Sequence, residues 1–507
     1  MPNNKILTVD ELAGILDEAR AQGKKIAHCH GVYDLLHIGH INHLQAARRF
    51  GNLLVVTVTP DKYVNKGPHR PAFGQQLRAK ALAALDCVDY VAVNEWPTAV
   101  QTIDLLHPDF YVKGRARDTG KRDHSDAILR EEQAIRAIGG QLMLTDEETF
   151  SASSLINRHM DILGPEVKTF LSHFTKRYTP EQIIGILQSI RKLKVLTIGE
   201  TIVDEYHFCS VMGKANKDPI LAARYNRKQC YAGGILAIAN HLGNFCDDVT
   251  VLTFLGERDS QEDFVRSALH ERSNKKFLYK TDSPTIVKRR FIEEYLARKL
   301  FEVYVMDDKP LTKADEDELC ATLEATLAHY DLVVVADYGH GMFTERAISL
   351  ICEKSKYLAV NVQVNAGNRG FNFITKYPRA DFVSIDEPEA RLETRSHNAD
   401  LRAVIGAIEQ KMDCPSFLVT RGAKGCLCFN KEQGFSEFPA FAVKVIDRIG
   451  VGDALLAICA PCLALGASMN QVGFIANIVG AQACAIMGNQ RSVDPVSVFR
   501  HITSLMK

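Results

Sequence analysis

The stretch KIAHCHGVYDLLHIGH, residues 25–40, contains the strongest fold signal in the chain. It starts as a short apolar strand, passes through a glycine, and ends where His37 and His40 enter a helical pattern. Further short apolar strands follow at 53–58, 90–93, 110–114 and 141–145. Amphipathic stretches separate these strands, and the alternation predicts a doubly wound, mostly parallel sheet covered by helices.

A second αβ series occupies the C-terminal part of the chain and begins with KVLTIG, residues 194–199. Its further strands are expected at 249–256, 332–339, 359–364, 381–386 and 416–422. Between the two series, residues 165–192 have the pattern of two helices. We therefore predict an α/β chain of two doubly wound domains, at 1–160 and 193–507, joined by a helical linker at 161–192.

The composition is that of an ordinary folded protein. Lys plus Arg and Asp plus Glu both number 61, so the formal net charge is zero and no global field favours nucleic acid or an anionic membrane. No apolar run reaches roughly 18 residues, the length needed to cross a bilayer, and the N-terminus lacks a signal-peptide core. The thirteen cysteines suit reduced thiols, and the single CxxC, Cys459 to Cys462, lies in an apolar run typical of core packing. We expect a cytoplasmic protein without a nucleic-acid or membrane partner.

The junction between the first strand and its helix is suited to phosphate binding. In doubly wound sheets, ligands bind at the carboxyl ends of the strands, where a helix N-terminus presents free N–H groups to anions. His37 and His40 lie at this junction, and Gly39 between them lets the backbone approach a ligand closely. A nucleoside triphosphate is the ligand we expect. The alternative is that two surface histidines meet here by chance.

Residues 31–40 fit the pattern G-x-[FY]-D-x-x-H-x-G-H. This pattern is the signature of the cytidylyltransferase-like nucleotidyltransferases, which the chain resembles from about residue 25 to 158. Other motifs follow in the order that the family uses, namely Lys66-Gly67, Arg70-Pro71, Arg78, Tyr111 to Gly114, and Phe150 to Ile156. The resemblance implies a Rossmann-like fold and attack of a phosphate oxygen on the α-phosphate of a nucleoside triphosphate, with release of pyrophosphate.

The same resemblance implies roles for individual residues. His37 and His40 would contact the triphosphate and stabilise charge in the transition state, and Lys66 would also be catalytic. Together, Lys66 and Arg78 would hold phosphates of the donor and the acceptor. Nucleotide contacts are further implied for Val32, Tyr33, Lys113, Ser153 and Ser154. The two serines fit a plain helix N-cap pair equally well.

One departure from the family pattern concerns the acceptor. Family members that activate glycerol phosphate with CTP carry R-T-x-G-I-S-T-[ST], whereas residues 147–154 read EETFSASS and lack the arginine. This segment looks more like the transferase half of the bifunctional heptose kinase and adenylyltransferase proteins, as does its lead-in at 138–140. The resemblance favours a sugar phosphate as acceptor and leaves ATP and CTP both open as the nucleotide.

Residues 447–454, DRIGVGDA, resemble the D-T-x-G-A-G-D signature of the ribokinase-like (PfkB) sugar kinases. The resemblance covers about 193–500 and implies an αβα fold in which Asp453 takes the proton of a sugar hydroxyl. An anion hole for the transferred phosphoryl group is implied at Gly450, Val451 and Gly452. Substrate contacts are implied for Asp204, Gly233 and Gly234, and nucleotide or Mg²⁺ contacts for Glu389, Thr420, Gly422 and Gly425. The alternative is a glycine-rich helix entry without chemistry.

Several positions depart from the kinase pattern. The G-G-x-x-N motif reads Gly233 to Ala237 without its asparagine, and residues 361–368 replace D-P-K-G. The N-x-x-E motif begins with Asp386, and Arg448 and Ile449 replace small residues beside the anion hole. A different acceptor or an inactive kinase would each account for these changes. The retained base and its flanking glycines favour activity.

Together the two resemblances predict a bifunctional sugar-activating enzyme. Its C-terminal domain would phosphorylate a heptose-like sugar with ATP, and its N-terminal domain would couple the sugar phosphate to ATP or CTP, with Mg²⁺ as cofactor and no directly bound metal. In the heptose enzymes the kinase half comes first, so the domain order is reversed here. We expect a homo-oligomer, a dimer, because both folds often dimerise.

Two alternatives stay open. In the first, a cytidylyltransferase for a sugar or polyol phosphate carries an inactive kinase-like domain that serves regulation or dimerisation. In the second, the chain is a nucleotide-binding regulator that keeps both folds without enzyme activity.

Overall fold

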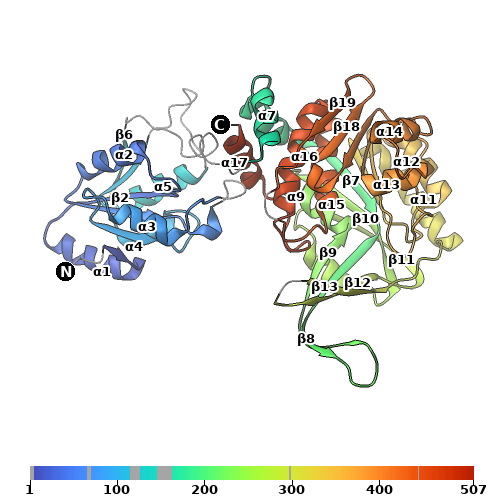
Figure 1. Cartoon of the computed structure of the whole chain (residues 1–507), viewed down its shortest axis with the longest axis horizontal. Helices are drawn as coiled ribbons and strands as arrows, with labels where there is room; N and C mark the ends of the chain where they lie inside the picture. Colours follow the sequence, from blue (N-terminus) through green and yellow to red (C-terminus); the bar gives the residue numbers. More distant parts are fainter. Residues whose placement is uncertain are drawn as a thin grey trace. The chain divides into compact units, whose positions relative to one another are not determined.

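The structure is a computed structural model that describes residues 5–64, 70–114, 126–145, 163–295, 298–442 and 445–506. The chain forms two compact units whose main parts are Met1–Gly164 and Pro165–Ile502 (Figure 1). Across these described residues, no helix is long and apolar enough to cross a membrane. Both CxxC cysteines, Cys459 and Cys462, are fully buried, as the packing interpretation predicted.

A parallel six-stranded sheet forms the centre of the N-terminal unit, within its described residues. The strands are β1 (Ile6–Leu7), β2 (Ile26–Gly31), β3 (Leu53–Val58), β4 (Tyr90–Val93), β5 (Phe110–Gly114) and β6 (Gln141–Thr145). Their spatial order is β1-β4-β3-β2-β5-β6, so the chain winds in opposite directions from β2. The carboxyl ends of β2 and β5 therefore flank the switch point where doubly wound sheets bind ligands. The predicted doubly wound fold is confirmed.

Helices cover both faces of this sheet. The helices are α1 (Val9–Ala21), α2 (Ile38–Arg48), α3 (Gln75–Ala83), α4 (Val100–Leu106) and α5 (Asp126–Ala137). Leu44 of α2 and Leu82 of α3 pack with Val56 of β3, whereas Leu16 of α1 packs with Val55. Because successive side chains of a strand point to opposite faces, β3 contributes to two separate cores.

The C-terminal unit is built on a large sheet of nine described strands in the order β11-β10-β7-β14-β15-β16-β17-β18-β19. These are β7 (Lys194–Gly199), β10 (Asp248–Arg258), β11 (Asn274–Pro284), β14 (Leu332–Asp337), β15 (Leu358–Val362), β16 (Phe382–Asp386), β17 (Ser416–Thr420), β18 (Cys426–Asn430) and β19 (Gly434–Phe438). The strands run parallel up to β17, and β18 and β19 are antiparallel. All six strands predicted for this part of the chain are present.

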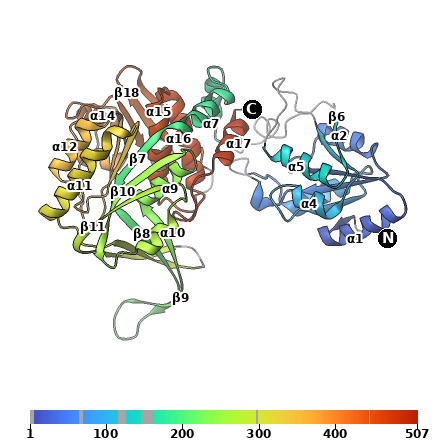
Figure 2. The ribbon, with the colours of Figure 1, turned by 180° about the vertical axis from the view of Figure 1, so that it is seen from behind.

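A second sheet in the same unit was not predicted. It contains β8 (Thr201–Lys214), β9 (Leu221–Gly234), β12 (Ile286–Glu293) and β13 (Arg298–Val305), in the order β13-β12-β8-β9. We call these four strands the small sheet. Its β8 and β9 form a long hairpin that extends away from the helices of the unit (Figure 2).

Helices cover both faces of the large sheet (Figure 1). One layer contains α9 (Ile235–Gly243), α15 (Val451–Ala464) and α16 (Met469–Ala483), and the other contains α11 (Lys313–Thr326), α12 (Glu345–Lys354), α13 (Glu387–Thr394) and α14 (Leu401–Glu409). The described residues of the unit also form α7 (Pro165–Phe174), α8 (Pro180–Ser189) and α10 (Glu262–Ala268), and α17 (Pro495–Leu505) belongs to it up to Ile502. Phe174 of α7 stacks on Phe474 of α16 at 4.3 Å between ring centroids. The first helix of the expected linker thus packs on the C-terminal unit.

Candidate active sites

The N-terminal candidate site lies at the connection between the end of β2 and the start of α2. His37 is the N-cap of α2, and its Nδ1 accepts a hydrogen bond from the backbone N–H of Gly39 at 3.1 Å. A neutral imidazole whose Nδ1 accepts carries its proton on Nε2. His37 Nε2 is buried and has no hydrogen-bond partner among the described residues, and burial lowers the pKa of His37. The Nε2–H group is therefore available to donate to a phosphate oxygen.

His40 and Tyr33 complete this arrangement. The imidazoles of His37 and His40 stack with their centroids 3.9 Å apart, and the Tyr33 ring meets His40 edge-on at 5.3 Å. Tyr33 has a φ of 49° and is buried, so the backbone turns sharply directly after β2. The structure thus brings together His37, His40 and Tyr33 as the sequence predicted.

A buried ion pair joins Asp34, which follows β2, to the segment that starts at Arg70. Asp34 accepts from Arg70 Nη1 at 3.1 Å and from the backbone N–H groups of Ala72 and Phe73, at 2.5 and 3.3 Å. The side chains of Asp34 and Arg70 are 1% and 2% exposed. Both residues belong to the family motifs quoted from the sequence, but their pairing was not predicted.

The Arg78 guanidinium bonds to groups of the protein, whereas we expected it to contact a phosphate. It is buried in α3 and donates to the carbonyl groups of Val32, Phe73 and Thr59 and to the carboxylate of Asp61. These bonds join the segments that follow β2 and β3. In this structure Arg78 supports the walls of the site, and Val32 contributes its carbonyl to that support.

Lys113, at the end of β5, is also engaged within the protein. Its ammonium lies 2.9 Å from Glu131 of α5 and 5.0 Å from the centroid of the Tyr111 ring. Glu131 in turn accepts from the backbone N–H of Ala99 at 3.2 Å. The other residues predicted for this site, Lys66, Ser153 and Ser154, lie outside the described residues.

The C-terminal candidate site is a cavity of about 1360 Å³ between the small sheet, the carboxyl ends of the large sheet and α15. Most of the residues predicted for the kinase line it, namely Asp204, Gly234, Glu389, Thr420, Gly422, Gly425, Gly450, Val451, Gly452 and Asp453. Gly233 lies behind Asp204, where a Cβ would come within 2.5 Å of the Asp204 carboxylate. The tertiary structure thus brings together residues that are more than 240 positions apart in the sequence, as Asp204 and Asp453 are.

Asp453 lies in the first turn of α15 and is 7% exposed. Tyr338 Oη and Gln363 Nε2 both donate to its Oδ1, at 2.9 and 3.1 Å. Among the described residues, no donor contacts Oδ2. Burial raises the pKa of Asp453 to about 6, against the opposing effect of the Tyr338 bond. A carboxylate with one oriented oxygen and one free oxygen suits proton transfer near neutral pH.

Glycine is required at the entry to α15. Gly450 is the N-cap with a φ of 79°, and a Cβ at this position would overlap Asn489 Oδ1. The first N–H groups of a helix have no acceptor within the helix. Gly450, Val451 and Gly452, for which an anion hole is predicted, line the cavity together with Asp453.

Two cations of β12, Lys288 and Arg290, line the same cavity, and neither was predicted as a site residue. Arg290 pairs with Asp204 and with Glu302, and the Asp204 side chain is 5% exposed. Lys288 is 7% exposed and has no hydrogen-bond or ion-pair partner among the described residues. Burial lowers the pKa of Lys288, although Asp204 opposes this effect. The alternation of Lys288 and Arg290 along a strand is the signal that places both on one face.

Glu389, on α13, also lines the cavity. It forms a capping box with Asp386, and its Oε1 accepts from the backbone N–H of Val364 at 3.0 Å. Burial, followed by the charge of Asp386, raises the pKa of Glu389 to about 8. No cluster of three or more potential metal ligands is found among the described residues.

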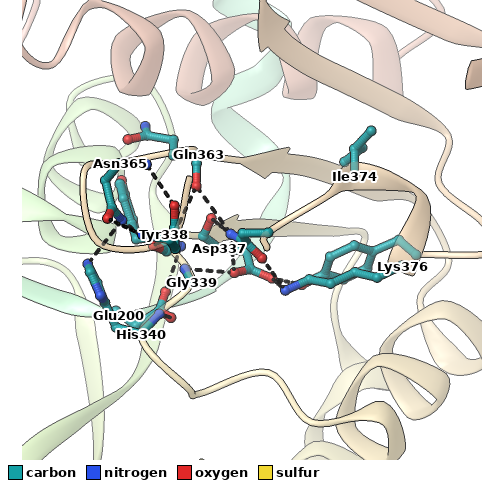
Figure 3. A network of polar contacts seen from close by, with 12 residues as sticks. Glu200, Asp337, Tyr338, Gly339, His340, Gln363, Asn365, Ile374 and Lys376 are labelled. Atoms are coloured by element: carbon teal, nitrogen blue, oxygen red, sulfur yellow. Dashed lines mark hydrogen bonds and ion pairs between the residues drawn. The ribbon is translucent and has the colours of Figure 1, made fainter. Parts of the chain in front are cut away.

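A polar network behind the base holds Tyr338 in position (Figure 3). Glu200 accepts from the backbone N–H groups of Tyr338 and His340 at 3.0 and 3.1 Å, and Asn365 Nδ2 donates to the Tyr338 carbonyl at 2.7 Å. Asp337 accepts from Tyr377 Oη at 2.8 Å and pairs with Lys376. Segment 361–368, which departs from D-P-K-G, thus supplies Asn365 to this network and Gln363 to the base.

Comparisons with known proteins match two families along the chain. The cytidylyltransferase-like family model matches residues 28–159, and the pfkB family carbohydrate kinase model matches residues 192–495. The bifunctional protein HldE of Geobacter sulfurreducens is 46% identical over 165 residues, which are 32% of this chain and 32% of that protein. HldE of Syntrophotalea carbinolica is 36% identical over 162 residues, covering 31% and 32% respectively. The chain therefore spans about a third of the length of these curated relatives.

Among solved structures, the C-terminal unit is similar in fold to Escherichia coli phosphofructokinase-2 in complex with fructose-6-phosphate. The TM-score is 0.51 at 13% identity, over 62% of this chain and all of that one. The family model of the kinase covers well over half of the chain, and a nucleotidyltransferase-like domain precedes it. The chain belongs to the pfkB family of carbohydrate kinases and carries a cytidylyltransferase-like domain ahead of the kinase fold.

Proposed function

We propose that this chain is a bifunctional sugar-activating enzyme. The C-terminal domain phosphorylates a heptose-like sugar with ATP, and the N-terminal domain couples the resulting sugar phosphate to ATP or CTP. The observation that carries the proposal is the position of Asp453. This carboxyl group is buried beside Gly450, where the structure leaves no room for a Cβ, in a cavity lined by residues of both sheets of the C-terminal unit. The similarity to HldE proteins supports the second activity.

For phosphoryl transfer, Asp453 Oδ2 takes the proton of the acceptor hydroxyl. The hydroxyl oxygen forms a bond to the γ-phosphorus as the bond to the bridging oxygen breaks, and ADP leaves. The N–H groups at the start of α15 stabilise the charge that develops on the transferred group. Tyr338 and Gln363 hold the other carboxylate oxygen, so that Asp453 is oriented before the acceptor binds.

The acceptor end of the cavity favours a substrate with an anionic group. Lys288 is buried, and its ammonium lies 5.3 and 5.9 Å from the centroids of the Tyr304 and Tyr338 rings. It has no hydrogen-bond or ion-pair partner among the described residues, and a buried ammonium is stabilised further by a compensating negative charge. Asp204 is already paired with Arg290, although its carboxylate still lines the cavity and suits sugar hydroxyls. A sugar that carries a phosphate or carboxylate fits this set of groups.

For nucleotidyl transfer, an oxygen of the sugar phosphate attacks the α-phosphorus, and pyrophosphate leaves. His37 Nε2–H donates to a phosphate oxygen at the N-terminus of α2, and the His40 ring stacks on the His37 ring. Catalysis of this kind consists mainly of positioning and charge stabilisation. We keep Lys66, Ser153 and Ser154 in the proposal as further phosphate contacts.

Mg²⁺ would enter both reactions with the nucleotide phosphates. The carboxylates of Asp386 and Glu389 line the kinase cavity, and their oxygen donors suit Mg²⁺ held through water. When bound, Mg²⁺ neutralises charge on the phosphate oxygens.

The small sheet supports the expected dimer. Aromatic rings form a row across its four strands. His207, Phe291 and Phe301 stack in turn, and Tyr225 lies tilted against His207. Tyr225 and Phe301 are more than half exposed. Because clustered exposed aromatic groups normally mark a contact surface, we assign the dimer contact to this face. Light scattering on Phe301→Glu and wild type tests this face, and an unchanged mass would contradict it.

The proposed function is tested by pyrophosphate release with Mg²⁺, ATP or CTP in turn, and a panel of sugar and polyol phosphates. His40→Ala should lower this release about 100-fold or more while sparing the kinase. Asp453→Asn should abolish phosphorylation of the sugar and spare nucleotidyl transfer from presupplied sugar phosphate. If wild type never phosphorylates a sugar but releases pyrophosphate, the C-terminal domain is a binding or dimerising module.

A further inference from the structure

Asp447, the first residue of the kinase signature, is a centre of hydrogen bonding beside the anion site. Its Oδ1 accepts from Lys299 Nζ at 2.7 Å and from the backbone N–H groups of Arg448 and Ile449 at 2.8 and 3.2 Å. Its Oδ2 accepts from Tyr206 Oη at 2.8 Å and from the backbone N–H of Gly488 at 3.0 Å. The Asp447 side chain is 8% exposed. Five donors therefore converge on one buried carboxylate.

The two side-chain donors come from the small sheet. Lys299 lies on β13 and Tyr206 on β8, whereas Asp447 directly precedes the loop that opens α15. Ile449 of the same loop packs against a cluster of the small sheet that contains Tyr206. The loop thus contacts the small sheet through both an ion pair and an apolar contact.

The same face of the small sheet reaches the acceptor end of the cavity. Asp204 and Tyr206 are two residues apart on β8, so their side chains point to the same side. The Arg290 guanidinium, which pairs with Asp204, lies 5.8 Å from the Tyr206 ring. A displacement of this face on acceptor binding would therefore shift the donors of the small sheet that contact Asp447.

We propose that Lys299 is a positioning residue that fixes the anion-hole loop to the small sheet through Asp447. Its ammonium compensates the buried carboxylate, and the carboxylate in turn orients the N–H groups of Arg448 and Ile449 at the entry to α15. The loop therefore takes its catalytic shape only while the small sheet is in place. This inference rests on the proposed phosphoryl transfer and adds to it a coupling between the acceptor side and the anion hole.

The electrostatics support this role. Burial disfavours the charged form of Asp447. The hydrogen bond and charge of Lys299, together with the hydrogen bonds from Tyr206 and the Ile449 N–H, outweigh this effect, so the pKa of Asp447 lies below its usual value. Without the ammonium, a buried anion would lose its only side-chain cation among the described residues. Such a carboxylate either takes up a proton or turns toward water, and both changes release the backbone N–H groups that it holds.

The test compares Lys299→Met with Lys299→Arg and with a matched control, Lys228→Met. Lys228 is a small-sheet lysine that pairs with Glu205 at 2.9 Å and does not contact Asp447. We expect Lys299→Met to lower kcat for phosphoryl transfer about 10- to 100-fold, with KM for ATP unchanged. Lys299→Arg should retain most of the activity, and Lys228→Met should resemble wild type.

Chemical rescue distinguishes positioning from general destabilisation. Methylammonium carries the N–H groups and charge that Lys299→Met removes, whereas tetramethylammonium carries the charge without N–H groups. We expect methylammonium to restore part of the lost kcat and tetramethylammonium to restore none. An unchanged kcat in Lys299→Met, or equal effects of both salts, would overturn the proposal.

A second readout does not depend on kinase activity. Hydrogen exchange of the amides of 448–452 should be faster in Lys299→Met than in wild type and Lys228→Met, while exchange in β14 stays the same. If wild type phosphorylates no acceptor, the proposed function fails. This exchange experiment still decides whether Lys299 fixes the loop through Asp447. Equal exchange in all three proteins would refute the role of Lys299.

Discussion

Asp453→Asn should stabilise the C-terminal unit while removing its proposed kinase activity. The folded protein holds this carboxyl with a pKa of about 6, above its ordinary value of 3.8, because burial disfavours its charge. One pKa unit corresponds to about 1.4 kcal/mol, so ionised Asp453 costs the folded state about 3 kcal/mol above pH 6. Asparagine has nearly the same shape and carries no charge. Its carbonyl oxygen can accept from Tyr338 and Gln363 as Oδ1 does.

The sign of the pH dependence follows from the raised pKa. Between about pH 6 and 3.8 the folded state of wild type binds a proton that the unfolded state releases, so acidification removes the cost. The gain from Asp453→Asn should therefore be about 3 kcal/mol at pH 8 and close to zero at pH 4.

Urea-dependent hydrogen exchange of β14 measures this free energy of unfolding in the intact chain. Its residues Leu332–Asp337 are all buried, so their amides exchange through opening of the unit. Tyr338→Phe is the matched control, because it removes a hydrogen bond to the same carboxylate without removing the charge. A gain that is equal at pH 8 and pH 4, or a loss at pH 8, would refute the electrostatic reasoning.

Four further predictions follow from the same structure. His37→Ala should lower pyrophosphate release about 100-fold or more, because it removes an oriented donor, and unchanged release would contradict the site. Arg70→Ala should cost about 3 kcal/mol in urea unfolding of the N-terminal unit, since it leaves buried Asp34 unpaired; a change near zero would show that water compensates the charge. Gly450→Ala should lower phosphoryl transfer at least about 10-fold in steady-state assays, because its φ of 79° and Asn489 exclude a Cβ, and wild-type rates would disprove this. His241 has a pKa lowered to about 4 by burial, so stability should fall as pH drops from 6.5 to 4, by up to about 3 kcal/mol, and His241→Gln should weaken this loss in hydrogen exchange.

Most strands of the six-stranded and nine-stranded sheets were predictable because each is a local apolar run. The strands β1, β11, β18 and β19, which lie at or next to the edges of these sheets, were not predicted. In β3 and β14 nearly every side chain is buried, as expected for parallel strands covered on both faces. The signature motifs were equally visible, because a helix entry that binds phosphate needs glycine and its chemistry within a few consecutive residues. His37 and Asp453 were found for this reason.

The small sheet was missed because its strands lack this apolar signal. β9 reads LAARYNRKQCYAGG and is largely exposed over its first eight residues. β12 buries Lys288 and Arg290, so charged residues occupy positions where a sequence pattern expects apolar ones. Only pairing with β8 and β13 makes these segments strands.

The sequence by itself determined two αβ units, the two phosphate-binding helix entries, and the residues expected to act there. The tertiary structure alone decided the partners of those residues. Arg78 has the same residue type that a phosphate contact would need, yet its guanidinium is used by carbonyl groups that lie up to 46 positions away. Lys299 and Asp447 are separated by 148 positions. A local pattern records which groups a segment offers, whereas burial and pairing depend on distant segments, and these decide whether a charge binds a ligand or supports the fold.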